Sequence, residues 1–290
     1  MTEEKIFDEN FYKKLNILRT KARMNRAAAG QSGARKSRAK GSSVEFSDFR
    51  EYMLGDDIRR IDWNAYGRFD RLFVKLFNEE KEGVFRVYVD TSASMDFGEK
   101  SKAACALRIA GALSYCVLEN ADRLVLNAIT PGGVVKYKSV TGRNAFARTL
   151  EKLENMRFDG KADTLEAIKR SEIKSAGMSI IISDFYTENL EDILRYLAYT
   201  KQEILLVQVL SREEAEPALE GTLSLIDSED GSELRVTASG ALMKTYRENY
   251  ERFMSEMDRL SRKYGAKHLT VVSDEALDEI FYKILTRIGM

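Results

Sequence analysis

The chain has 290 residues, of which 44% are hydrophobic, and it carries 46 basic and 46 acidic residues. A chain of this length can bury a sizeable core, as one large domain or as a domain with an appendage. The zero net charge argues neither for nor against a nucleic-acid partner, and the single histidine excludes the H-E-x-x-H motif and most zinc clusters.

The first 44 residues are predicted to form a helix over 4–28 and a basic loop, ARKSRAKGSS, over 34–43. Ten Lys or Arg and no acid fall between residues 11 and 40. Such a segment can bind nucleic acid, although a solvated or protein-facing surface is the more ordinary interpretation. The acidic start, MTEEKIFDEN, lacks the apolar region of a signal peptide, and apolar runs such as ILLVQVL are too short to span a bilayer. We therefore expect a cytoplasmic protein without a membrane span.

Residues 45–82 form a charge-dense segment with regularly placed apolar side chains. We expect this segment to pack as an extension on the domain that follows it, over 83–290, rather than to stand as a flexible module. Its expected anchors are Phe46, Phe49, Tyr52, Ile61, Trp63, Leu72 and Phe73.

From residue 83 onward, strand and helix patterns take turns along the chain. Short, nearly all-apolar strands are typical of a parallel sheet that is covered on both faces. The expected elements are a strand at 83–90, a helix at 99–120, a hairpin around TPGG (130–133), helices at 143–156 and 163–175, strands at 177–185 and 203–210, a hairpin around DSEDGS, a helix at 241–264, a strand at 267–273 and a final helix. This alternation predicts an α/β fold with a mostly parallel sheet and helices on both faces.

The two cysteines, Cys105 and Cys116, fall in one predicted helix. At about 1.5 Å of rise per residue they lie roughly 16 Å apart, which is too far for a disulfide. We interpret them as core thiols in a reducing compartment, which agrees with a cytoplasmic location.

The stretch VDTSASMDFG (89–98) places Asp90, Ser92 and Ser94 at the end of a predicted buried strand. Asp184 ends another such strand, SIIISDF, and Thr164 lies in the loop-to-helix junction GKADTL. Ligands of open parallel sheets bind at the carboxyl ends of the strands, so we expect these five residues at one edge. DTSAS alone is more typical of a polar strand-to-helix turn than of a metal site. Two carboxylates with three hydroxyls suit Mg²⁺, with Mn²⁺ or Ca²⁺ as alternatives, and leave room for a partner's Asp or Glu.

The order D-x-S-x-S, then Thr, then Asp resembles the metal-ion-dependent adhesion site of the von Willebrand factor A fold. Upstream, VEFSDFREYMLGDDIRRIDWNAYGRFDRLFVKLFNEE (44–80) resembles the signature of a bacterial and archaeal family of A domains, domain-of-unknown-function family fifty-eight. Members of this family are often encoded beside MoxR-type AAA+ ATPases. The resemblance implies an adaptor or co-chaperone that docks an acidic group of such an ATPase, or of its client, through the metal. In the family's metal-site pattern the threonine usually follows glycine. Here Asp163 precedes Thr164, so Asp163 is an alternative ligand.

Enzymatic alternatives find less support in the sequence. There is no G-x-x-x-x-G-K-[ST] phosphate loop and no G-x-S-x-G elbow. The best enzymatic hypothesis is metal-assisted phosphoester hydrolysis with Mg²⁺ on Asp90 and Asp184, but no general base is evident. A nucleic-acid-binding accessory acting through the basic amino-terminal arm is the third hypothesis. We therefore expect a protein that is not an enzyme.

Overall fold

The protein is described by a computed structural model that covers residues 5–15, 44–79, 82–98, 101–217, 221–228 and 231–288. The chain divides into two compact units, residues 1–25 together with 83–290, and residues 26–82. Of the predicted amino-terminal helix, residues 5–15 are described; the chain is helical over 9–15 and not over 5–8. The basic loop at 34–43 lies outside the described residues.

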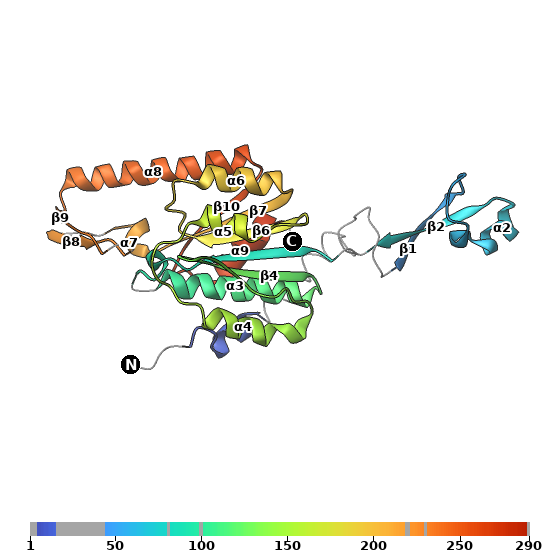
Figure 1. Ribbon diagram of the computed structural model, residues 1–290, viewed down its shortest axis with the longest axis horizontal. Helices are drawn as coiled ribbons and strands as arrows, with labels where there is room; N and C mark the ends of the chain where they lie inside the picture. The colour runs from blue at the N-terminus through green and yellow to red at the C-terminus, as the bar shows by residue number, and fades with distance from the viewer. Residues whose placement is uncertain are drawn as a thin grey trace. The chain divides into compact units, whose positions relative to one another are not determined.

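The larger unit contains a six-stranded sheet in the order β10-β7-β6-β3-β4-β5 (Figure 1). Its elements are β3 (Val84–Asp90), α3 (Lys102–Glu119), β4 (Arg123–Thr130), β5 (Gly133–Lys136), α4 (Phe146–Glu154), α5 (Thr164–Arg170), β6 (Gly177–Ser183), α6 (Leu190–Tyr199), β7 (Gln202–Leu210), α7 (Arg212–Ala215), β8 (Thr222–Ile226), β9 (Glu233–Thr237), α8 (Gly240–Lys263), β10 (Lys267–Val272) and α9 (Leu277–Ile288). All neighbouring strands in this sheet are parallel except β4 and β5, which form an antiparallel hairpin. β8 and β9 form the second predicted hairpin. The prediction of a mostly parallel sheet is confirmed.

Both faces of the sheet are buried. Successive side chains of a strand point to opposite sides, so one strand contributes to the core on each face. Val87 and Val89 of β3 lie in a core with side chains of α3, α4 and α9. Tyr88, between them, lies in a second core with side chains of α5, α6 and α8. Figure 1 shows α3 and α4 on one side of the sheet and α6 and α8 on the other. The predicted helices on both faces are therefore confirmed.

The amino-terminal segment contributes directly to the first of these cores. Phe7, Phe11 and Leu15 are almost fully buried there. Phe7 and Phe11 lie beside Gly111 of α3, where a Cβ atom would meet the Phe7 ring at 2.8 Å. The glycine therefore lets this segment approach α3 closely, and residues 5–15 belong to the α/β unit.

One predicted helix, 163–175, is shorter in the structure and ends at Arg170. The hydroxyl of Ser171 donates to the carbonyl oxygen of Ile168, and Glu172 has a positive φ of 53°. A left-handed residue cannot continue a right-handed helix. The apolar pattern beyond Arg170 belongs instead to the loop that leads into β6.

The smaller unit is an antiparallel pair, β1 (Val44–Glu51) and β2 (Phe73–Glu79), with a short helix, α2 (Trp63–Phe69), between the strands. Asp62 caps α2 by accepting hydrogen bonds from two backbone N–H groups, and it pairs with Lys75 at 3.2 Å. Of the predicted apolar anchors, Ile61 is buried, whereas the Trp63 side chain is 64% exposed. Trp63 is therefore not part of a core in this unit. The packing of the segment on the α/β domain stays a prediction.

The predictions about the two cysteines and about membrane-spanning helices can be compared with the structure. Cys105 and Cys116 are both free thiols, as predicted, and Cys105 is buried. Across the described ranges, no helix combines the length and the apolar character needed to cross a membrane.

Candidate metal centre

The five residues chosen from the sequence line one cavity of about 570 Å³. Asp90 ends β3, Ser92 is the N-cap of the 3₁₀ turn that follows, η2 (Ala93–Met95), and Ser94 lies in that turn. Thr164 is the first residue of α5, and Asp184 directly follows β6. Because β3 and β6 are parallel neighbours, their carboxyl ends meet at the same edge of the sheet. The structure thus brings together residues up to 94 positions apart in the sequence.

Asp90 is a buried carboxylate whose hydrogen-bond donors, among the residues that the structure describes, are all neutral. Its Oδ1 accepts a hydrogen bond from the backbone N–H of Ser92 at 3.0 Å, and its Oδ2 accepts one from the Ser183 hydroxyl at 2.6 Å. Burial raises the pKa of Asp90 above its usual range, and the nearby charge of Asp184 raises this pKa further. Both causes disfavour the ionised carboxylate, so a bound cation would relieve an unfavourable charge here.

The hydroxyl groups of the cavity have unused capacity as metal ligands. The Oγ atoms of Ser92 and Ser94 lie 3.0 Å apart, which is close enough for both to face a single ion. Thr164 is only 6% exposed and lines the same cavity, so its hydroxyl can supply a third neutral oxygen ligand.

Asp184 has a different environment from Asp90. Its Oδ1 accepts from the backbone N–H of Tyr186 at 3.2 Å, and its Oδ2 lies 3.0 Å from the ammonium nitrogen of Lys102. The same ammonium lies 2.7 Å from Oε1 of Glu214. Of the two carboxylates predicted as metal ligands, Asp184 therefore already has a cationic partner.

Asp163, the alternative to Thr164, is exposed and serves as the N-cap of α5. Its Oδ1 accepts a hydrogen bond from the backbone N–H of Glu166 at 3.0 Å. Asp163 also lines the cavity. Capping explains why an aspartate stands at this position, and the choice between Asp163 and Thr164 as a ligand stays a prediction.

The donor set of the cavity fits a hard divalent cation such as Mg²⁺. It offers carboxylate and hydroxyl oxygens, and neither a histidine nor a cysteine is among the described residues that line it. No group of three or more His, Cys, Asp or Glu side chains able to hold a metal occurs among the described residues. The site is therefore unlike a zinc cluster, and the two carboxylates predicted as ligands, Asp90 and Asp184, leave further coordination to water or to an external ligand.

Sequence reasoning missed three residues around the two candidate carboxylates. Ser183 donates to Asp90, but the sequence marks it only as a residue inside the predicted strand 177–185. Lys102 contacts Asp184 from 82 positions away, Glu214 contacts Lys102, and no local pattern marks either residue. Only the fold brings these groups together.

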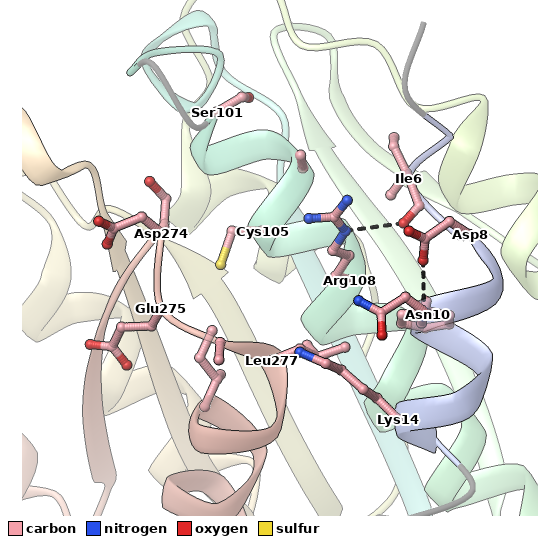
Figure 2. A pocket seen from close by; sticks show the side chains of 15 residues that line it. Ile6, Asp8, Asn10, Lys14, Ser101, Cys105, Arg108, Asp274, Glu275 and Leu277 are labelled. Atoms are coloured by element: carbon pink, nitrogen blue, oxygen red, sulfur yellow. Dashed lines mark hydrogen bonds between the residues drawn. The ribbon is translucent and has the colours of Figure 1, made fainter.

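A second cavity, of about 550 Å³, lies beside Cys105 (Figure 2). Figure 2 shows Asp274 and Glu275 on one side of this thiol and Arg108 on the other. Asp274 accepts two hydrogen bonds from the guanidinium of Arg212, each 3.0 Å long. Burial raises the pKa of the Cys105 thiol to about 12, so it stays protonated and unreactive at neutral pH. We therefore assign no chemistry to this cavity.

Comparison with known proteins adds a family and distant relatives. The family described as "Protein of unknown function DUF58" matches residues 48–259. An uncharacterized protein of Mycobacterium tuberculosis is 28% identical over 243 residues, which cover 81% of this chain and 76% of the relative. A solved aerotolerance-related membrane protein of Bacteroides fragilis is similar with a TM-score of 0.47 at 13% identity, covering 71% of this chain and 98% of that one. The SpRpn10 VWA domain gives a TM-score of 0.42 at 8% identity, covering 70% and 95%.

Proposed function

The chain belongs to the DUF58 family, whose function is unknown, and we propose that it is a non-catalytic adaptor that binds a partner protein through a divalent cation. The residues that would hold the cation are Asp90, Ser92, Ser94, Thr164 and Asp184. When bound, a cation of this kind supplies a Lewis-acidic position that accepts an oxygen ligand from outside the chain. Mg²⁺ is the cation that the donor set fits best, with Mn²⁺ and Ca²⁺ as alternatives.

The observation that carries this proposal is the uncompensated charge of Asp90. This carboxylate is 5% exposed, its hydrogen-bond donors among the described residues are all neutral, and it lies near a second carboxylate. Buried charges in proteins are paired or coordinate metals. A divalent cation would give Asp90 the missing positive charge.

The partner is expected to provide an Asp or Glu side chain. Two carboxylates neutralise a divalent cation formally, and Asp184 shares its charge with Lys102, so the bound cation would still attract an anion. The resemblance of residues 44–80 to its family's signature makes a MoxR-type AAA+ ATPase, or its client, the partner that we propose. In that role the protein is a cytoplasmic adaptor or co-chaperone.

Binding of the full-length chain to a purified MoxR-type AAA+ ATPase from the same organism tests the proposal. Association should be measured by biolayer interferometry in Mg²⁺ and in EDTA, for the wild type, Asp90→Ala and Asp274→Ala. We expect the wild type and Asp274→Ala to bind in Mg²⁺ only, and Asp90→Ala to bind in neither buffer. Equal binding of all three proteins in both buffers would remove the metal from the mechanism.

The two alternatives predict different results with the same proteins. Turnover of p-nitrophenyl phosphate that is lost in Asp90→Ala would identify a hydrolase and contradict an adaptor without catalysis. Binding to random DNA or RNA with a steep salt dependence would point to the basic amino-terminal arm. Neither activity is expected.

A further inference from the structure

Lys102, the first residue of α3, is fully buried beside the candidate metal centre. Its ammonium nitrogen lies 3.0 Å from Oδ2 of Asp184 and 2.7 Å from Oε1 of Glu214. The aromatic rings of Phe97 and Tyr186 lie 5.9 and 5.8 Å from the same nitrogen. A buried lysine is costly unless it is paired, so this arrangement is a specific feature of the fold.

Glu214 is held firmly in the position from which it contacts Lys102. Its Oε2 accepts from the backbone N–H of Ser211 at 2.7 Å, while the Ser211 hydroxyl accepts from the backbone N–H of Glu214 at 3.1 Å. These reciprocal bonds form the capping box of α7. The Tyr246 hydroxyl of α8 donates to the carbonyl oxygen of Glu214 at 2.6 Å. The ammonium group is thus shared between a fixed carboxylate and a candidate metal ligand.

We propose that Lys102 is a built-in competitor of the divalent cation, and that Glu214 sets the strength of this competition by drawing the ammonium away from Asp184. The inference rests on the metal-dependent function proposed above and concerns the regulation of that same site. The positive charge of Lys102 at the Asp184 carboxylate repels a second cation and satisfies an oxygen that the cation would otherwise use. Removing the lysine should therefore strengthen metal binding, and removing Glu214 should weaken it.

The competition gives the partner's acidic group a second role. In the free protein, Lys102 keeps the affinity for the cation low. A partner carboxylate adds negative charge at the same position and stabilises the bound cation, so the metal and the partner bind cooperatively. Because such coupling is reciprocal, the metal raises the affinity for the partner by the same factor.

Titration calorimetry with MgCl₂ and MnCl₂ on the full-length chain tests this proposal without any activity measurement. We expect Lys102→Met to bind each metal about tenfold more tightly than the wild type, because a neutral side chain of similar length replaces the ammonium. Lys102→Arg keeps the positive charge and should stay within about threefold of the wild type. Glu214→Gln should bind the metal several-fold more weakly, because Lys102 then depends on Asp184 alone.

The opposite signs of the two effects separate competition from general damage to the site. Lys102→Met leaves the Asp184 and Glu214 carboxylates without the ammonium group and should lower the unfolding temperature in EDTA. The titrations are therefore run at temperatures at which circular dichroism shows that the variant is folded. If this variant does not fold, Glu214→Gln carries the test, because the Glu214 side chain is partly exposed. Metal binding by Lys102→Met but not by the wild type would also support the proposal.

Two results would overturn it, and they are distinguishable from each other. In the first result, the wild type binds Mg²⁺ through Asp90, but Lys102→Met binds it no more tightly than the wild type, or Glu214→Gln binds it no more weakly. The proposed competition is then wrong, and the metal site stands. If neither the wild type nor Lys102→Met binds either metal, the proposed metal site is wrong as well.

Discussion

The two cavities of the α/β domain have nearly the same volume, about 570 and 550 Å³, and both contain aspartates that follow parallel strands. In the Cys105 cavity, the Asp274 carboxylate pairs with both Nε and Nη2 of Arg212. In the metal-site cavity, the donors to Asp90 among the described residues are neutral hydroxyl and backbone N–H groups. The two aspartates therefore differ in the compensation of their charge, although the cavities have similar volumes.

This difference shows which physical property identifies the candidate site. A carboxylate paired with a guanidinium in two-point geometry already has a strong, specific partner. A buried carboxylate with neutral donors keeps an unfavourable charge, which a ligand can relieve. The acids of the Cys105 cavity are consequently expected to be structural, and Asp90 is expected to be functional.

The largest expected effect is the loss of metal binding when Asp90 is replaced. Asp90→Ala should lower the affinity for Mg²⁺ by more than about 100-fold, since removing even an outer partner of a ligand costs 10–100-fold. Asp274→Ala removes a carboxylate from the other cavity and should leave the affinity unchanged. Titration calorimetry on both variants measures the contrast. Equal losses in the two variants, or none in either, would contradict the distinction between the cavities.

A smaller effect is expected for Ser183, which donates the 2.6 Å hydrogen bond to Asp90. Ser183→Ala leaves Asp90 less well oriented and should weaken Mg²⁺ binding by about 10–100-fold, the usual cost of losing an outer partner of a metal ligand. Ser114→Ala is a matched control, because the Ser114 hydroxyl is buried but donates within α3 to the carbonyl oxygen of Ala110. If Ser183→Ala binds Mg²⁺ like this control, Ser183 does not position Asp90.

The raised pKa of Asp90 predicts a pH dependence in the metal-free protein. The folded state binds the proton of Asp90 more tightly than the unfolded state, so the free energy of unfolding falls as the pH rises through the unfolded and then the folded pKa. The buried charge of Asp90 destabilises the protein only where the carboxylate is ionised. The destabilisation is absent below the pKa that Asp90 has in the unfolded state and complete above the pKa that it has in the folded state. In EDTA at neutral pH, Asp90→Asn should therefore be more stable than the wild type, and the gap should close in acid.

Urea unfolding of both proteins between pH 4 and 8 measures this effect. Adding Mg²⁺ at neutral pH should stabilise the wild type and leave Asp90→Asn unchanged. A wild type that gains stability relative to Asp90→Asn as the pH rises in EDTA would show that the Asp90 charge is already compensated.

The smallest effects belong to the Cys105 cavity. Because the pKa of Cys105 is raised to about 12, iodoacetamide at pH 8 should modify this thiol slowly in the folded protein and rapidly after unfolding. Cys105→Ser should bind Mg²⁺ like the wild type. Mass spectrometry of the modified peptides follows the reaction, and rapid modification of Cys105 in the folded protein would show that this cavity contains a reactive group.

The sequence was sufficient to predict the parallel sheet and the grouping of Asp90, Ser92, Ser94, Thr164 and Asp184, because strand ends and their polar residues are local features. It was not sufficient to identify Lys102, which lies in an apolar helix and contacts Asp184 82 positions away. Trp63 was predicted to anchor the 45–82 segment on the α/β domain; its side chain is largely exposed in its own unit, and the anchoring stays a prediction. Buried ion pairs and exposed aromatic side chains depend on tertiary packing, which periodicity does not encode.

Anomalous diffraction from crystals of the full-length chain soaked in MnCl₂ tests the metal centre most directly. The account predicts an anomalous peak within direct or water-mediated coordination distance of Asp90, Ser92 and Ser94, and no such peak in crystals of Asp90→Ala. Crystals of the wild type that show no peak in this cavity, or a peak beside Asp274 and Glu275 instead, would contradict it.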